Sequence, residues 1–576
     1  MTRNYKEEYQ RWLDSPALSE SEWEELNSIA NDEKEIESRF FAPLEFGTAG
    51  LRGTMKLGLH QMNVHIIRHA TQAFANVIKA EGEEAMKKGI AICFDCRNNS
   101  ELFAHEAACV MAANGIHVRI FDALRPTPEL SFAVRYYGTT AGLNITASHN
   151  PKEYNGYKVY WSDGAQLPPQ HAEAIAEQMS KIDIFDDFVS CDFDEAVSQG
   201  KIELIGTETD EAYLECVLGQ AINKPLVAKV APELKIVYTP FHGAGYKLVP
   251  EALRRLGITQ LYPVPEQMVI DGNFPTVESP NPENPEGFYL AVDLAKKVGS
   301  DLIIGTDPDS DRIGVMVRSG GDYISITGNQ LGVLLLDYVI NARKAAGTLP
   351  ENAGAVKSIV TTEMAKAVAE TNGVHFEDTF TGFKFMAERI AQWEKAGSYK
   401  YIFAYEESYG YMMGDYVRDK DAVTASMMVA EMAAYYHDKG MNLSQAMESL
   451  YEKYGRYAEK TLNLVMPGLD GIVKMKDLMA ELRNNPPKQI AGVEVFKLRD
   501  YSDGNIKVPE LGVMGKTPIK GSNVLYFELA DGTSFIVRPS GTEPKVKVYI
   551  LCKGADKAEC DAKIAKYSEY AESLRK

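Results

Sequence analysis

The chain has 576 residues, of which 45% are hydrophobic and 25% charged, and its formal net charge is −20. This composition is ordinary for a water-soluble globular protein, and the length predicts three to five domains. The acidic charge argues against nucleic acid as a partner, because nucleic-acid binding needs a basic surface. No apolar run reaches the roughly 18–20 residues that a membrane span needs, so we expect no membrane association.

The first residues of the chain and its cysteines indicate a reducing compartment. The N-terminus is charged and lacks the apolar core of a signal peptide. Seven cysteines are few for this length, which favours free thiols and a cytoplasmic location. Cys93 and Cys96 form a CxxC pair, but we expect a strand there, in which positions three apart face opposite sides. We therefore do not expect them to share a metal ion.

Residues 1–45 are expected to form amphipathic helices. The segment "SESEWEEL" offers a capping box in which Ser21 precedes Glu24 by three residues. Beyond it, one pattern recurs three times. An apolar run ends in small or polar residues and a helix-like stretch follows, and this first run lies at 89–100, 234–245 and 355–366.

Each recurrence continues with two more apolar runs. The second run lies at 116–129, 258–267 and 374–386, and the third, which breaks into a polar loop, lies at 141–151, 300–312 and 400–410. Continuous apolar strands that alternate with helices predict α/β units with largely parallel sheets. Three sets with the same layout predict three similar domains.

The pattern changes after about residue 455. Residues 523–553 give three β-rich runs, with the hairpin signal "ADGT" at the first turn, and an amphipathic helix closes the chain. We therefore predict an α/β fold: three similar α/β domains with mixed, largely parallel sheets, followed by a C-terminal α+β domain. The predicted boundaries are 1–213, 214–324, 325–454 and 455–576.

The loops after the three third runs are the candidate sites, because ligands of open parallel sheets bind beyond the carboxyl ends of strands. In "GTDPDSDRIG", Asp307, Asp309 and Asp311 alternate directly after a strand. Three carboxylates this close repel one another unless a cation is present, and an oxygen-preferring ion such as Mg²⁺ fits. An EF-hand is excluded because Arg312 and Arg318 replace its glycine and glutamate. The alternative is a solvated acidic turn.

Ser148, in "TASHNP", allows two interpretations. It can cap a helix that begins ahead of Pro151. Alternatively, near a Mg²⁺ site, its hydroxyl can carry a phosphoryl group whose oxygens complete the metal shell. A serine-protease site is disfavoured, because His149 is adjacent in sequence and there is no GxSxG motif.

Further loops contain groups suited to a phosphorylated sugar. Glu406 and Ser408, in "YEESYG", offer a carboxylate and a hydroxyl for sugar hydroxyls. The segment "RPSGTEP" offers a guanidinium, hydroxyls and backbone N–H groups that suit a phosphate, from Arg538, Ser540, Gly541 and Thr542. Four cations could line such a site in an acidic protein, although each is by itself most often a surface charge: Arg52, Lys158, Arg418 and Lys420.

Together these motifs resemble those of the α-D-phosphohexomutase family. "TASHNP", "GTDPDSDR", "EESYG" and "RPSGTEP" are similar to its phosphoserine, metal, sugar and phosphate loops, and they stand in the family's order. The resemblance extends from about residue 41 to the C-terminus, and "LEFGTAGLRG" is most similar to the branch of long-chain phosphoglucomutases and phosphopentomutases. It implies four domains around one cleft, the first three alike.

The resemblance also implies a role for each motif residue. Ser148 would hold the phosphoryl group and complete the metal shell of Asp307, Asp309 and Asp311, while Arg312 would steady the phosphoserine. The sugar hydroxyls would be bound by Glu406 and Ser408. The non-reacting phosphate would be bound by Arg538, Ser540, Gly541 and Thr542, with Arg418 as a further substrate contact. Proton transfer or charge stabilisation would fall to Arg52, His149, Lys158 and Lys420.

The sugar loop departs from that of some bacterial relatives, which read "GEMSGH" and place a histidine near the reacting oxygen. Here Tyr409 and Gly410 follow Ser408. This leaves the general base open, and we favour Lys158 or Lys420. Lys158 would then need a pKa lowered by neighbouring cations such as Arg52.

The implied activity is the interconversion of glucose 1-phosphate and glucose 6-phosphate through a phosphoserine enzyme and glucose 1,6-bisphosphate, with one Mg²⁺ per chain. Phosphopentomutase and glucose 1,6-bisphosphate synthase are the close alternatives. An aspartyl-phosphate phosphatase is disfavoured, because Asp311 stands where its motif needs Thr or Val. A non-catalytic sugar-phosphate binding protein would not need the intact serine and aspartates. We expect a phosphosugar as partner and a monomer or weak homodimer.

Overall fold

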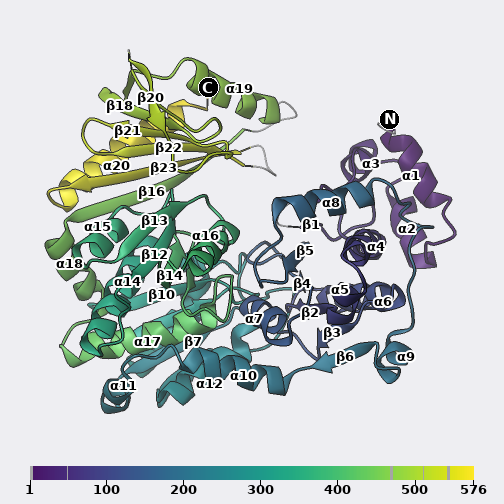
Figure 1. The fold of residues 1–576 in the computed structure, drawn as a ribbon, viewed down its shortest axis with the longest axis horizontal. Helices are drawn as coiled ribbons and strands as arrows, with labels where there is room; N and C mark the ends of the chain where they lie inside the picture. Colours follow the sequence, from purple (N-terminus) through teal and green to yellow (C-terminus); the bar gives the residue numbers. More distant parts are fainter. Residues whose placement is uncertain (1–3, 48–49, 467–470, 510, 541–544, 576) are drawn as a thin grey trace. The chain divides into compact units, whose positions relative to one another are not determined.

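The computed structural model describes residues 4–47, 50–466, 471–509, 511–540 and 545–575. The chain divides into two compact units. The first unit comprises residues 1–327 and 408–442, and the second comprises residues 328–407 and 443–576. Figure 1 labels many of the helices and strands, which are numbered in chain order.

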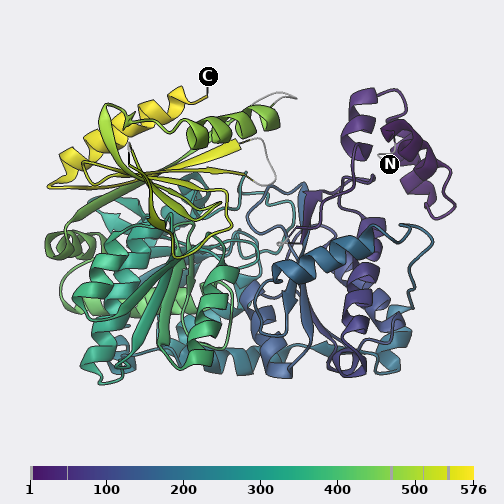
Figure 2. The same ribbon diagram turned by 45° about the horizontal axis from the view of Figure 1, so that its top comes forward.

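Three helices open the first unit, as the sequence predicts: α1 (Tyr5–Leu13), α2 (Glu20–Ser28) and α3 (Glu33–Phe40) (Figure 2). Trp12 of α1 is buried against Phe40 of α3, with ring centroids 5.6 Å apart. The capping box of α2 is made by Ser19 and Glu22, so the prediction of Ser21 and Glu24 is wrong. Both pairs have the required spacing, and the helix begins after the earlier serine.

The first α/β module has a six-stranded sheet in the order β1-β5-β4-β2-β3-β6. Four strands are parallel: β2 (Ile90–Phe94), β3 (Val118–Phe121), β4 (Ala141–Ile145) and β6 (Ile202–Ile205). Two antiparallel strands extend the sheet beyond β4: β5 (Tyr154–Trp161) and β1 (Leu51–Thr54). The helices of this module are α4 (Val64–Ala80), α5 (Glu83–Lys88), α6 (Ser100–Ala113), α7 (Thr127–Tyr137), α8 (Pro169–Met179) and α9 (Phe193–Ser198).

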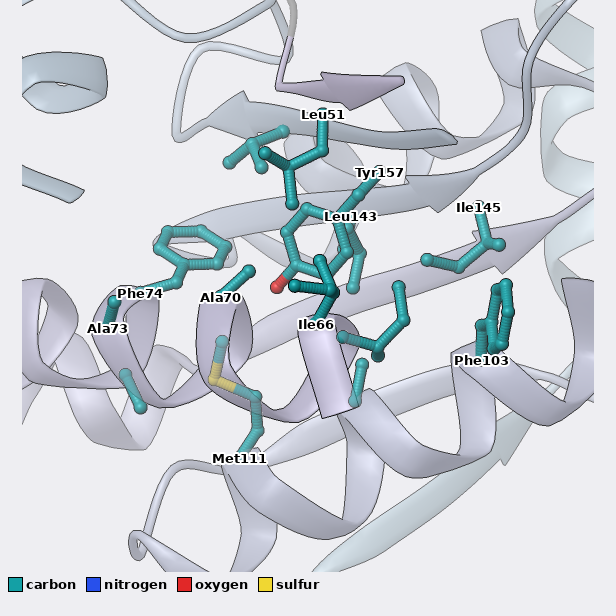
Figure 3. Packing of buried hydrophobic residues seen from close by; sticks show 14 of the residues in the cluster. Leu51, Ile66, Ala70, Ala73, Phe74, Phe103, Met111, Leu143, Ile145 and Tyr157 are labelled. Carbon is teal, nitrogen blue, oxygen red and sulfur yellow. The ribbon is translucent and has the colours of Figure 1, made fainter. Parts of the chain in front are cut away.

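Both faces of this sheet are covered, which explains why its central strands are apolar throughout. On one face, Ile66 and Phe74 of α4 and Met111 of α6 pack with Leu143 and Tyr157 of the sheet (Figure 3). On the other face, α7 packs against β2 and β4. With both faces covered, the loops beyond the strand ends are where this module can present polar groups.

The second module has a five-stranded sheet in the order β11-β10-β9-β7-β8. Three strands are parallel, β7 (Lys235–Thr239), β8 (Gln260–Pro263) and β9 (Leu302–Thr306), and two continue antiparallel, β10 (Ile313–Ser319) and β11 (Asp322–Ile326). Its helices are α10 (Thr207–Leu218), α11 (Lys224–Val230), α12 (Gly245–Leu256), the 3₁₀ helix η1 (Pro285–Phe288) and α13 (Tyr289–Val298). The unit ends with β15 (Gly410–Met412) and α17 (Ala422–Asp438), which packs against α12.

The second unit opens with the third module. Its strand β12 (Ala353–Ser358) pairs in parallel with β13 (His375–Thr379) and with β14 (Lys400–Glu406). The helices of this part are α14 (Gly328–Ala345), α15 (Met364–Thr371), α16 (Phe383–Ala396) and α18 (Leu443–Tyr454).

The three modules share one strand order, which confirms the prediction of three similar α/β units. In each, the first run forms the central strand and pairs in parallel with the second run on one side and the third on the other. The corresponding orders are β4-β2-β3, β9-β7-β8 and β14-β12-β13. Each third run therefore ends at an equivalent place in its module.

The rest of the second unit is built on an antiparallel sheet in the order β16-β23-β22-β21-β18-β19-β20. The "ADGT" hairpin is confirmed, because β21 (Leu525–Leu529) and β22 (Ser534–Pro539) flank it as an antiparallel pair. The other strands are β16 (Arg456–Val465), β17 (Gln489–Ile490), β18 (Val493–Asp500), β19 (Asn505–Val508), β20 (Gly512–Lys516) and β23 (Lys545–Gly554). Two helices accompany the sheet, α19 (Gly471–Asn484) and α20 (Lys557–Ser573), the predicted closing helix.

The predicted α/β fold class is confirmed by the mixed sheets and the helices around them. The four domain boundaries remain a prediction. Within the described ranges, no helix has the length and apolar character needed to cross a membrane.

Candidate active site

Ser148 lies in the loop that joins β4 to β5, and it is 4% exposed. No helix begins in this loop, so the interpretation of Ser148 as a helix cap is wrong. The residue has a φ of 53°, in the left-handed region that non-glycine residues seldom adopt. Such a conformation persists when the surrounding structure fixes it.

The side chain of Ser148 points toward the loop that follows β9. Its Oγ donates a hydrogen bond to Asp307 Oδ2 at 2.9 Å, and it lies 3.2 Å from His149 Nδ1. The backbone N–H of Ser148 donates to Thr146 Oγ1 at 2.9 Å. The serine hydroxyl is therefore held against an acidic group of the second module.

Asp307, Asp309 and Asp311 are all buried, so the alternative of a solvated acidic turn is wrong. One carboxylate oxygen from each lies within 4.8 Å of the others, and the three could hold a metal ion. The backbone N–H groups of Asp311 and Arg312 both donate to Asp307 Oδ1, at 3.0 and 2.9 Å. Hydrogen bonds within the loop thus hold the carboxylate of Asp307 in place.

The donor atoms of this cluster fit a hard divalent cation. Asp309 Oδ1 and Asp311 Oδ1 are buried, and they accept no hydrogen bond from the part of the chain that the structure describes. A buried carboxylate oxygen without a partner is costly, and coordination to a cation would remove that cost. Carboxylate oxygens are also the ligands that Mg²⁺ prefers.

Asp307 and Asp309 have pKa values that are shifted in opposite directions. Burial raises the pKa of Asp307 well above its usual range, and the carboxylates of Asp309 and Asp311 raise it further. Burial also opposes ionisation of Asp309, but the ammonium of Lys158 and hydrogen bonds to its carboxylate lower its pKa overall. Lys158 Nζ donates to Asp309 Oδ2 at 2.8 Å.

Lys158 and Lys420 both reach the aspartate cluster. Lys158 Nζ lies 3.6 Å from Asp311 Oδ2, and Lys420 Nζ lies 3.2 Å from the same oxygen. Burial lowers the pKa of Lys158, but Asp309 and Asp311 outweigh it and the pKa is raised overall. The lowered pKa that Lys158 would need in order to act as a base is therefore not found here, because the attraction of these two carboxylates outweighs burial and the neighbouring cations.

Two more predicted catalytic residues border the Ser148 loop. Arg52 on β1 donates to Asn150 Oδ1 at 3.2 Å. Burial lowers the pKa of His149 well below its ordinary value, and the charges of Arg312 and Arg52 lower it further, so this imidazole is neutral. Arg52 and His149 thus place a guanidinium and a neutral ring beside the Ser148 loop.

The remaining candidates of the first unit are Arg312, Arg418 and Ser408, and Arg312 Nε lies 3.9 Å from Asp311 Oδ1. Arg312 pairs with Glu283 Oε1 at 2.8 Å. Arg418 is buried, and its guanidinium donates to the carbonyl oxygens of Asp415 and Val417 at 2.7 and 3.1 Å. Ser408 is half-buried at the start of the segment that returns to this unit.

Five candidates lie in the second unit, and the structure describes three of them. Glu406 is buried at the end of β14, where the N–H of Gly382 donates to its Oε1 at 2.5 Å. Arg538 and Ser540 are half-buried at the end of β22 and just beyond it, and Arg538 lies 3.5 Å from the hydroxyl of Tyr549. The other two predicted residues of this loop, Gly541 and Thr542, lie outside the described residues.

Sequence reasoning missed two residues that support the site. Thr127 at the start of α7 binds Asp309 twice, through its N–H to the carbonyl oxygen and through its Oγ1 to Oδ2, both at 2.8 Å. Arg97 follows β2 and donates to carbonyl oxygens of the Ser148 loop. Both residues follow parallel strands of the first module, where polar groups that bind ligands are expected, and this position in the sequence could have revealed them.

Family models for phosphoglucomutase/phosphomannomutase match four successive parts of the chain. They are the α/β/α domains I, II and III, at residues 43–184, 211–320 and 327–454, and the C-terminal domain, at 475–566. A phosphoglucomutase from Staphylococcus saprophyticus is 36% identical over 520 residues, which cover 90% of this chain and 92% of that protein. The chain belongs to the phosphoglucomutase/phosphomannomutase family.

Solved structures of this family have the same fold. A phosphoglucomutase of Paramecium known as parafusin, in its open form, matches with a TM-score of 0.68 at 18% identity, over 93% of this chain and 95% of that one. A family member from Burkholderia thailandensis matches with a TM-score of 0.65 at 18% identity, over 92% and 97% of the two chains. The resemblance to the phosphohexomutases is thus confirmed.

Proposed function

We propose that the protein is an isomerase that interconverts glucose 1-phosphate and glucose 6-phosphate by intramolecular phosphotransfer. Family membership and the curated relatives named phosphoglucomutase, at 35–36% identity over about nine-tenths of the chain, support this activity. The observation on which the proposal rests is the contact at 2.9 Å between Ser148 Oγ and the buried cluster of Asp307, Asp309 and Asp311.

The proposed reaction uses Ser148 as a phosphoryl reservoir. The bond between Ser148 Oγ and phosphorus breaks as the free hydroxyl of a hexose monophosphate attacks, and the hydroxyl proton passes to a base. Glucose 1,6-bisphosphate results, and it reorients in the site. Ser148 Oγ then takes the other phosphoryl group as its bond to the sugar oxygen breaks, and that oxygen takes the proton back from the base. The phosphoserine is restored, and the phosphate has moved between C1 and C6.

Asp307, Asp309 and Asp311, with a phosphoryl oxygen on Ser148, would hold one Mg²⁺. When bound, the cation offsets the charge of the transferring phosphoryl group. Lys158 and Lys420, whose ammonium groups lie within 3.6 Å of Asp311, add positive charge at the same place. Lys158 or Lys420 remains our candidate for the base that accepts the hydroxyl proton, and that residue would first have to lose its own ammonium proton.

The other motif residues enter the proposal as substrate contacts. The sugar hydroxyls would be bound by Glu406 and Ser408. Arg312 would steady the phosphoserine, and Arg418 would be a further substrate contact. The phosphate that does not react would be bound by Arg538, Ser540, Gly541 and Thr542. Because the same loop must accept either phosphate of the bisphosphate, we expect it to recognise charge more than ring shape.

The test compares kcat/KM for glucose 1-phosphate, mannose 1-phosphate and ribose 1-phosphate, with catalytic glucose 1,6-bisphosphate and Mg²⁺. We expect glucose 1-phosphate to give the highest value. A higher value for ribose 1-phosphate would assign the protein to the pentose reaction instead.

Peptide mapping of the phosphoenzyme should find the phosphoryl group on Ser148, whereas label on Asp307 would indicate a phosphatase.

We further propose a cytoplasmic enzyme that is a monomer or weak homodimer. All seven cysteines are free thiols, which is typical of a reducing compartment. Light scattering at micromolar concentration checks the oligomeric state, and a stable dimer or larger assembly would contradict the proposal.

A further inference from the structure

The Ser148 loop is tied to the end of a neighbouring strand by one arginine. Arg97 follows β2, is 3% exposed, and pairs with Asp95, whose Oδ2 lies 3.3 Å from Arg97 Nε. Asp95 also accepts a hydrogen bond at 2.6 Å from Thr146 Oγ1, at the base of the loop. The carboxylate thus fixes both the guanidinium and the start of the loop.

The two terminal nitrogens of Arg97 donate to four backbone carbonyl oxygens of this loop. Nη2 donates to Ser148 at 2.6 Å and also to Asn150, and Nη1 donates to Pro151 at 2.9 Å and to Tyr154 at 3.1 Å. The two nitrogens carry four N–H bonds in the plane of the guanidinium, and each can donate to one of the four carbonyl oxygens. A lysine has three donors on a single atom and cannot span them.

Ser148 itself has every polar group fixed. Its carbonyl accepts from Arg97, its N–H donates to Thr146 Oγ1, and its Oγ donates to Asp307 Oδ2. A serine at a φ of 53° is strained, so these bonds are what hold it there. Rotation of this one residue would move Oγ away from the aspartates.

A residue of the second module covers the guanidinium. The ring of Phe274, which is 3% exposed, lies 5.2 Å from the Arg97 Cζ. The cation is therefore shielded from water and in contact with an aromatic face, which strengthens its hydrogen bonds to the loop.

We propose that Arg97 is a positioning residue for phosphoryl transfer, because it holds the Ser148 loop in the conformation that aims Oγ at the aspartate cluster. This inference rests on the proposed function. Arg97 does not need to touch the substrate, since its reach ends at the loop's carbonyls. The expected consequence is on the rate of transfer to and from Ser148, rather than on sugar binding.

The first test is Arg97→Lys in the full-length protein. We expect kcat to fall roughly 10- to 100-fold, as for a misplaced reacting group, while KM for glucose 1-phosphate changes far less. Wild type and variant should both take up label on Ser148 from labelled glucose 1,6-bisphosphate. The variant should then pass that label to glucose 6-phosphate more slowly in a single turnover.

Arg39→Lys is the matched control. Arg39 is also buried, and its guanidinium binds Glu25, Glu35 and the carbonyl of Leu57 near the N-terminal helices. Its substitution should lower the melting temperature but leave kcat near the wild-type value. An equal fall in kcat for both variants would show a general loss of folding and would overturn the proposal.

Two further variants make the test independent of how Arg97→Lys folds. In Arg97→Ala, millimolar guanidinium should restore turnover at least severalfold, and equal ammonium should not. In Thr146→Val, which removes the acceptor of the Ser148 N–H, kcat should fall roughly tenfold.

The proposal is overturned if folded Arg97→Lys and Thr146→Val both keep kcat within twofold of wild type. If the Arg97 variants do not fold, a kcat of Thr146→Val within twofold of wild type is by itself enough to overturn the proposal. A wild type without mutase activity would overturn the proposed function instead.

Discussion

The loops after β4 and β9 occupy equivalent places in two modules with the same strand order, yet they present different chemistry. Each contains a serine with a φ of 53°, Ser148 in the first and Ser310 in the second. The Oγ of Ser148 bonds to Asp307, whereas the Oγ of Ser310 is buried and has no partner among the described residues. In the second loop the neighbouring carboxylates, rather than the serine, are the groups placed for chemistry.

The two loops also differ in what holds them. The Ser148 loop is held by Arg97 and Asp95 of its own module. The carboxylate of Asp309, in contrast, is held by Thr127 and Lys158 of the other module. The comparison teaches that one strand-end scaffold supplies a hydroxyl in one copy and carboxylates in the next, and that each becomes useful through contacts with the other.

The largest effect should come from removing the hydroxyl. Ser148→Ala should lower turnover by roughly 10⁴-fold or more, because no other group replaces a lost nucleophile, and Mg²⁺ binding should survive. Ser310→Ala, the equivalent change in the other loop, should keep most turnover. Assays of kcat and calorimetric Mg²⁺ titrations of both variants check this. Comparable losses of turnover in the two would contradict the distinction between the loops.

The next effect should come from the carboxylates. Asp309→Asn should weaken Mg²⁺ binding roughly 100-fold, because it removes one charged ligand from the cluster. Isothermal titration calorimetry measures the affinity. Mg²⁺ should also raise the melting temperature of wild type more than that of the variant.

A matched control for this change is Asp322→Asn. Asp322 lies on β11 of the same module, and its side chain is 72% exposed. Its substitution should leave Mg²⁺ affinity unchanged. Equal affinities for wild type and Asp309→Asn would remove this aspartate from the metal site.

Much of this comparison could be predicted from the sequence, because the signals are local. Alternating aspartates directly after an apolar run mark a strand-end loop, and Asp307, Asp309 and Asp311 are indeed brought together there. The triple recurrence of apolar runs predicted three similar modules. It did not give the strand order, since pairing between strands depends on contacts far apart in the chain.

What the sequence could not supply are the long-range partners. Thr127 and Asp309 are 182 residues apart, and Arg97 and Ser148 are 51 apart, so no spacing rule connects them. The same limitation applies to the pKa of Lys158, for which the sequence suggested only neighbouring cations such as Arg52 as a cause of any shift. Its carboxylate partner Asp309 is 151 residues away, and only the fold places it 2.8 Å from the ammonium.

A smaller effect should follow from cutting one contact between the loops. Thr127→Val removes the Oγ1 hydrogen bond to Asp309 and keeps the backbone bond. One such bond is worth about 1 kcal/mol, so we expect kcat/KM to fall roughly fivefold and Mg²⁺ affinity to weaken by a similar factor. A fall in kcat/KM with unchanged Mg²⁺ affinity would mean that Thr127 does not act through Asp309.

The smallest effect concerns the helix that presents Thr127. Glu129 on α7 is fully buried, and burial raises its pKa well above the usual range, helped by Asp210 and only partly opposed by Arg125. A carboxyl whose pKa is raised on folding stabilises the fold least at high pH. Its contribution is lost as pH rises from the unfolded value of about 4.3 toward the raised one.

Glu129→Gln is neutral at every pH and should remove this loss. The variant should therefore gain stability relative to wild type as the pH rises from 5.5 to 8, by up to about 1.4 kcal/mol per pH unit while Glu129 stays protonated in the folded protein. Melting temperatures of both proteins across this range measure it. Thr127, rather than Glu129, is the residue of α7 that binds Asp309. We therefore expect kcat at a fixed pH to change little. A stability difference that does not vary with pH would show that Glu129 is ionised in the folded protein, and the helix beside the metal loop would then contain a buried charge.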